Sequence, residues 1–188
     1  MKKMGNLIRL LDLDDDFIID LKYATSDNFT HEVIYDSNEC YLDEHTAEIL
    51  IAAKNLFRTD GYYVKVWDGY RPIRAQRKFW EIMPNEEFVA RPPDMSVIKT
   101  FRPTHMNGMC VDITLCDNKK KEIEMPSQFD DFTEKAHLSS SLISEKSRRN
   151  ATYLKNVMES VGFQAYDGEW WHFYDVSTEP KPFSDYPI

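Results

Sequence analysis

The stretch VDITLC, residues 111–116, is the feature that most constrains the fold. Its valine, isoleucine and leucine alternate with Asp112, a threonine and a cysteine. A period of two residues is typical of a β-strand, in which successive side chains point to opposite faces of the sheet. The pattern therefore predicts a strand with Asp112 on the face opposite its apolar neighbours.

Helical and strand patterns elsewhere in the chain come in segregated stretches. Helices are expected over residues 43–59, 72–83 and 148–161, and strands over 62–68, 169–175 and the start of 17–30. Residues 84–104 contain four prolines and are expected to be loop. This arrangement predicts an α+β fold with a mainly antiparallel sheet flanked by helices. The length of 188 residues favours one domain over residues 1–188.

Charge and cysteine content exclude several classes of function. The chain has 32 acidic and 23 basic residues and a net charge of −9, which disfavours nucleic acid and anionic membranes as partners. The basic start gives way to Arg9 and a run of aspartates, so we expect no secretory signal. Three cysteines without a CxxC pair suit a reducing compartment. We therefore expect a cytoplasmic protein, and the sequence does not indicate its oligomeric state.

Two distant stretches contain the residue types of a metal site. FRPTHMNGMCVDITL places His105 seven residues before Asp112, with Gly108 between them, and DGEWWHFYD contains His172. Zinc accepts imidazole nitrogen and carboxylate oxygen, and a catalytic zinc has three protein ligands and an open fourth position. A loop followed by a strand brings His105 and Asp112 together, and His172 completes the set. His-x6-Asp alone also occurs by chance in ordinary folded cores.

Glu169 is the natural general base beside such a metal, because a carboxylate accepts the proton of water that zinc has acidified. In a regular strand, however, Glu169 and His172 have opposite parity and face apart. Glu169 must therefore lie just before the strand, or a bulge must turn it towards His172. Gly168 makes both arrangements feasible.

Four ordered motifs together resemble a known family. H-x-x-G-x-x-x-D followed far downstream by E-x-W-H resembles the signature of zinc D-alanyl-D-alanine dipeptidases, the vancomycin-resistance-type enzymes related to zinc D,D-carboxypeptidases. IDLKYATSDNFT, WDGYRPIRAQ and FVA resemble segments of that family in the same order, from about residue 17 to 173. The resemblance implies that His105, Asp112 and His172 are zinc ligands and that Glu169 is the catalytic base.

The same resemblance implies roles for three further residues. Arg71 matches the arginine that stabilises the tetrahedral intermediate, and a fixed guanidinium suits the negative charge that develops there. Asp130, with Asp131 as its rival, matches the aspartate that binds the substrate's ammonium group. Tyr23 matches a tyrosine near the same end of the substrate. Considered singly, each residue also has a structural explanation. Arg71 suits a structural ion pair, Asp130 suits a helix cap, and Tyr23 suits core packing.

The chain departs from the family pattern at two positions. Pro103 replaces a serine two residues before His105, and Cys110 replaces an alanine two residues before Asp112. Cysteine is a small apolar substitute, whereas proline removes a hydroxyl and a backbone donor near the substrate. The exact substrate is therefore the open point.

Three functions follow from these observations. The first is zinc-dependent hydrolysis of D-Ala-D-Ala, or of a related small D-amino-acid dipeptide, in cell-wall metabolism. It suits a cytoplasmic enzyme because the free dipeptide is made in that compartment. The second is a D,D-carboxypeptidase or L,D-endopeptidase that acts on peptidoglycan fragments. The third is a non-catalytic zinc-binding domain, which the presence of both Glu169 and Arg71 disfavours.

Overall fold

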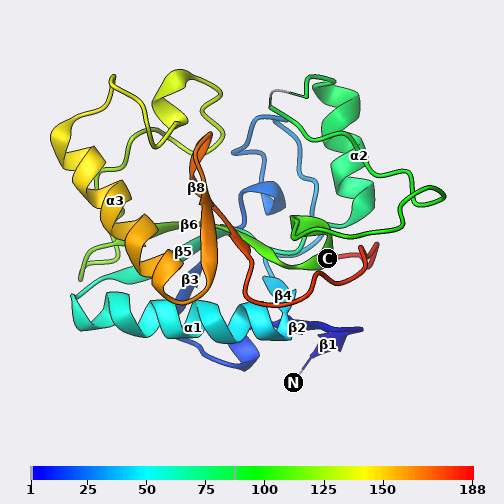
Figure 1. The fold of residues 1–188 in the computed structure, drawn as a ribbon, viewed down its shortest axis with the longest axis horizontal. Coiled ribbons are helices and arrows are strands. Elements are labelled where there is room, and N and C mark those ends of the chain that lie inside the picture. Colours follow the sequence, from blue (N-terminus) through cyan, green and yellow to red (C-terminus); the bar gives the residue numbers. More distant parts are fainter. Residues whose placement is uncertain (1, 87) are drawn as a thin grey trace.

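The computed structural model describes residues 2–86 and 88–188, and a five-stranded sheet forms its centre (Figure 1). The strand order is β3-β5-β6-β8-β7, in which β3 and β5 are parallel and the other pairs are antiparallel. The predicted α+β fold with a mainly antiparallel sheet is confirmed. The bounds of these strands are Phe17–Ile19 (β3), Tyr63–Asp68 (β5), Cys110–Cys116 (β6), Phe163–Tyr166 (β7) and Glu169–Asp175 (β8).

The central strand β6 contains the predicted alternating stretch. It pairs with β5 on one side and β8 on the other. All seven of its residues are buried, the polar ones included. A strand with covered faces needs partners for its polar side chains. Asp112 has such partners in two histidines, whereas the Thr114 hydroxyl has none among the described residues.

Three helices surround the sheet. Helix α1 (Glu44–Thr59) and helix α3 (Glu145–Ser160) contact each other, and α2 (Ile73–Ile82) lies on the other side of the molecule from α3 (Figure 1). Helix α3 begins three residues before the predicted start because Ser144 caps it, accepting a hydrogen bond from the Ser147 N–H at 3.0 Å. Pro72 is the N-cap of α2 and not its first helical residue.

Four short strands among the described residues were not predicted. Strand β7 forms a hairpin with β8, and β1 (Lys3–Met4), β2 (Leu7–Arg9) and β4 (Tyr41–Asp43) form a second, three-stranded sheet. Strands of two to four residues are too short to show a clear period. None of the helices in the described residues is both long and apolar enough to cross a membrane.

Candidate metal centre and active site

The loop before β6 is held in place by its glycine. His105 begins a short 3-10 helix (His105–Asn107), which Thr104 caps and which ends at Gly108 with φ 71°. The Gly108 carbonyl accepts a hydrogen bond from the Asp43 N–H at 2.9 Å. A Cβ at position 108 would lie 2.7 Å from that nitrogen and 2.5 Å from a Leu7 methyl carbon. Only glycine allows both this backbone conformation and this close approach, so the small sheet fixes the position of His105.

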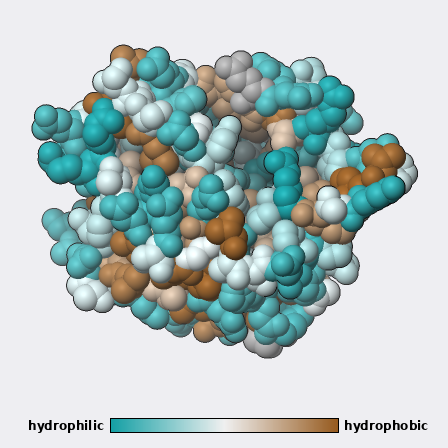
Figure 2. Space-filling model, viewed as in Figure 1, coloured by the Kyte–Doolittle hydropathy of each residue, from teal (hydrophilic) through white to brown (hydrophobic). Residues whose placement is uncertain are grey.

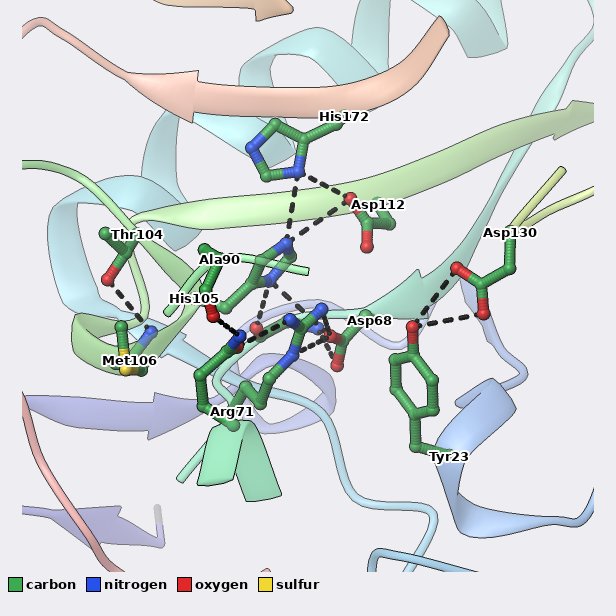
Figure 3. A network of polar contacts seen from close by, with 12 residues as sticks. Tyr23, Asp68, Arg71, Ala90, Thr104, His105, Met106, Asp112, Asp130 and His172 are labelled. Carbon is green, nitrogen blue, oxygen red and sulfur yellow. Dashed lines mark hydrogen bonds and ion pairs between the residues drawn. The ribbon is translucent and has the colours of Figure 1, made fainter. Parts of the chain in front are cut away.

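The three predicted metal ligands meet at one point (Figure 3). Asp112 on β6 is directly opposite His172 on β8, and His105 reaches them from its loop. The distances are 2.9 Å from Asp112 Oδ1 to His172 Nδ1, 3.2 Å from His105 Nε2 to His172 Nδ1, and 3.4 Å from His105 Nε2 to Asp112 Oδ1. Around a tetrahedral zinc with bonds of about 2.0–2.1 Å, neighbouring ligand atoms are about 3.3 Å apart. These three side chains therefore fit a zinc ion in donor type and in spacing.

A hydrogen bond orients the His105 ring for metal binding. Its Nδ1 lies 2.7 Å from the Gly69 carbonyl oxygen. A carbonyl only accepts, so Nδ1 must carry the proton, and the lone pair of Nε2 then faces His172 and Asp112. Burial alone would raise the pKa of Asp112, but the His105 and His172 rings hold that pKa well below its ordinary value. Asp112 is therefore a carboxylate ready to bind a cation.

Glu169 lies on the same side as His172, with 3.9 Å between its Oε2 and His172 Nδ1. It is the first residue of β8, and the pairing of β7 with β8 shifts register between Ala165 and Tyr166. This irregularity is the predicted break that brings Glu169 to the metal side. At Gly168, a Cβ would lie 2.8 Å from the Tyr166 ring, so a larger residue there would have to displace that ring. Burial raises the pKa of Glu169, and the negative charge of Asp112 adds to this increase.

Arg71 lies beside the metal ligands in a network that the sequence analysis did not identify. Its Nε and Nη2 donate to Asp68 Oδ2 at 3.0 and 2.7 Å, and its Nη1 donates to Gln76 Oε1 at 2.9 Å. Asp68 is completely buried and also accepts a hydrogen bond from Tyr35 at 2.8 Å. The only signal in the sequence was an aspartate three residues before Arg71 within WDGYRP. This network positions the guanidinium without using all of its N–H groups.

Asp130 and Tyr23 form the opposite end of the site. The Tyr23 hydroxyl donates to both carboxylate oxygens of Asp130, at 3.2 and 3.1 Å (Figure 3). Asp130 has a φ of 55°, a left-handed conformation that aspartate adopts more readily than most residues. Burial raises the pKa of its carboxyl well above the ordinary value, and the charge of Asp112 raises it further.

All seven predicted site residues line one cavity of about 550 Å³, and Asp131 does not. On the molecular surface, Figure 2 shows a hollow between the region over α3 and β8 and the region over α2. A three-ligand metal site, a half-buried glutamate and a fixed arginine in one cavity are the parts of a metal-dependent hydrolase.

Comparisons with known proteins specify this class. A model of the D-Ala-D-Ala dipeptidase family matches residues 3–187. The D-alanyl-D-alanine dipeptidase of Enterococcus faecium is 35% identical over 185 residues, covering 90% of this chain and 91% of that protein. The D-alanyl-D-alanine dipeptidase of Escherichia coli (strain K12) is 30% identical over 173 residues, covering 92% and 86%. The chain belongs to the D-Ala-D-Ala dipeptidase family, as its motifs predicted.

A solved structure supports the fold. The LdcB LD-carboxypeptidase superposes with a TM-score of 0.51 at 16% identity, covering 93% of this chain and 70% of that one. At this identity, the likeness establishes a shared fold and nothing about the substrate.

Proposed function

We propose that this protein is a zinc-dependent dipeptidase that hydrolyses D-Ala-D-Ala or a closely related small D-amino-acid dipeptide in cell-wall metabolism. One observation carries the proposal: a single cavity contains the metal ligands, Glu169 and Arg71 at one end and the Asp130–Tyr23 pair at the other. Two D-alanyl-D-alanine dipeptidases that are 30–35% identical over most of the chain support the choice of substrate.

His105, Asp112 and His172 would hold the zinc ion. When bound, zinc supplies Lewis acidity, which polarises the peptide carbonyl and lowers the pKa of a water molecule to about 7.

Glu169 moves the proton in this proposal. Its carboxylate takes a proton from the attacking water and then delivers it to the nitrogen of the leaving amino acid. Burial in the cavity raises the pKa of Glu169, which brings its basicity closer to what a reaction near neutral pH requires.

Arg71 stabilises the oxyanion. A guanidinium has five N–H donors, and Asp68 and Gln76 accept from three of them. An N–H group that neither of these two side chains binds can donate to the carbonyl oxygen as negative charge develops on it. Asp68 and Gln76 hold the guanidinium in place, so little reorganisation is needed during the reaction.

Asp130 and Tyr23 bind the free ammonium group of the dipeptide. A partly buried carboxylate such as that of Asp130 forms a strong charge-assisted hydrogen bond with an ammonium ion. A partner of this kind favours a free dipeptide over a longer peptide, whose nitrogen at that position is an uncharged amide. This preference distinguishes the dipeptidase from a carboxypeptidase on peptidoglycan fragments.

We place the enzyme in the cytoplasm. Its three cysteines, Cys40, Cys110 and Cys116, are free and buried, which suits a reducing compartment. Fractionation of the producing cells, followed by immunodetection, tests this assignment, and recovery outside the cytoplasm would contradict it.

The reaction is tested by measuring release of D-alanine from D-Ala-D-Ala by the zinc-loaded protein. Release is expected to stop when a chelator is added and to return with zinc. N-acetyl-D-Ala-D-Ala serves as the comparison substrate and is expected to be cleaved far more slowly. Faster cleavage of the acetylated peptide would favour the carboxypeptidase, and no cleavage of either by folded, zinc-loaded protein would refute the proposal.

A further inference from the structure

Three arginines line the cavity, and they differ in what they pair with. Arg71 is bound to Asp68 at 2.7 Å. Arg91 forms an ion pair with Glu86 at 2.8 Å. Arg102 has no ion pair within residues 2–86 and 88–188. It is therefore the cavity's available cation for binding an anionic group of the substrate.

The backbone that bears Arg102 is fixed, although its side chain is exposed. Asn107 is completely buried, and its Nδ2 donates to the carbonyls of Arg102 at 2.9 Å and Lys181 at 2.8 Å. Its Oδ1 accepts from the Thr104 N–H at 2.9 Å. Pro103 restricts the backbone further and offers neither a hydroxyl nor an N–H to a ligand. The fixed backbone leaves the guanidinium as the mobile group at this edge of the cavity.

Asp130 and the segment that leads from Arg102 to His105 approach the metal ligands from opposite sides. Thr104, two residues after Arg102, and Asp130 lie on either side of the metal ligands in Figure 3. A free dipeptide has an ammonium group at one end and a carboxylate at the other, and its two residues span at most about 7 Å. When Asp130 binds the ammonium and the peptide bond lies at the metal ligands, the carboxylate points towards the side from which residues 102–104 enter the cavity.

We propose that Arg102 binds the C-terminal carboxylate of the dipeptide and thereby determines the preference for a free acid at that end. This inference rests on the proposed dipeptidase function. The guanidinium forms two parallel hydrogen bonds with a carboxylate, which adds directional specificity to the charge attraction. Arg71 is held by Asp68 and has the proposed role at the peptide carbonyl, and Arg91 is paired with Glu86, which leaves Arg102 for this role.

The test measures binding without turnover. Dissociation constants for D-Ala-D-Ala and for D-alanyl-D-alaninamide are determined by calorimetry on zinc-loaded Glu169→Gln protein, with and without Arg102→Gln. Loss of Arg102 is expected to weaken binding of the free acid tenfold or more and to change binding of the amide less than twofold. Arg102→Lys, which keeps the charge but not the paired hydrogen bonds, is expected to give an intermediate loss for the acid.

Arg91→Gln is the matched control, because Arg91 lines the same cavity but is already paired. It is expected to leave both dissociation constants within twofold. An equal change for acid and amide on losing Arg102, or no change for either, would overturn the role of Arg102. Failure of the proposed function is detected separately, as absence of D-Ala-D-Ala hydrolysis by the unmutated enzyme.

Discussion

The two ends of the cavity are built differently. At the metal end, Asp112 and His172 are paired residues of β6 and β8, and His105 follows a turn held by buried backbone contacts. At the other end, Asp130 lies in an irregular segment between β6 and α3, has a positive φ, and is hydrogen-bonded to Tyr23. Two of the three groups that would hold the ion are therefore placed on the sheet and the third on a turn fixed against it, whereas the group that selects the substrate is placed on an irregular segment.

The largest expected effect comes from removing a metal ligand. His172→Ala leaves only two protein ligands, so zinc binding and hydrolysis are both expected to fall to background. Zinc content after dialysis and D-alanine release measure these two quantities. Tyr174→Phe, on the same strand and lining the same cavity, is the control and is expected to retain zinc. Full zinc content in His172→Ala would contradict the assigned ligand set.

Glu169→Gln tests the chemical step at the same end. General-base catalysis contributes roughly 10²–10⁴-fold, so kcat is expected to fall by about that factor while zinc remains bound. The raised pKa of Glu169 also predicts the pH profile, because only the deprotonated carboxylate accepts a proton. The rate is expected to decline on the acid side at a higher pH than for an ordinary glutamate. Retention of this acid limb in the glutamine variant would assign it to another group.

Asp130→Asn tests the end of the cavity that contains Asp130. Its effect on hydrolysis is expected to be smaller than that of Glu169→Gln and to depend on the substrate. Loss of the charge should lower kcat/KM for D-Ala-D-Ala by about 10–100-fold, as for a charge-assisted hydrogen bond. Cleavage of N-acetyl-D-Ala-D-Ala should change little. Because the pKa of Asp130 is raised, its carboxylate is lost as pH falls, and KM for the free dipeptide should rise on that side. Equal losses on both substrates would remove the distinction between the two ends.

The smallest expected effect concerns the turn that supports His105. Substitutions there are expected to change the folding equilibrium constant several-fold. Gly61→Ala places a side chain at φ 86° in open space and is expected to cost about 1 kcal/mol. Gly108→Ala meets the same backbone penalty plus contacts at 2.5 and 2.7 Å, so it is expected to cost more. Urea denaturation of the two variants measures the difference. Equal losses of stability would show that the turn is not locked by close packing.

Much of the catalytic end was predictable because its signals are local. The spacing of His105, Gly108 and Asp112 reflects a turn that leads into a strand, and the alternation in residues 111–116 assigns Asp112 to one face. The relation of Glu169 to His172 was only partly predictable. Residues 169 and 172 of a regular strand face opposite sides, so an irregularity near Gly168 was required. The register shift itself, however, depends on the pairing of β7 with β8.

The sequence by itself determined which residue types are present for zinc hydrolysis, because ligand chemistry depends on the side chain and on short spacings. Only the tertiary structure decided three further points. It selected Asp130 over Asp131 for the cavity, it joined Asp68 and Gln76 to Arg71, and it left Arg102 without an ion partner among the described residues. These outcomes depend on contacts between segments far apart in the chain or on loop geometry, and neither has a periodic signal in the sequence.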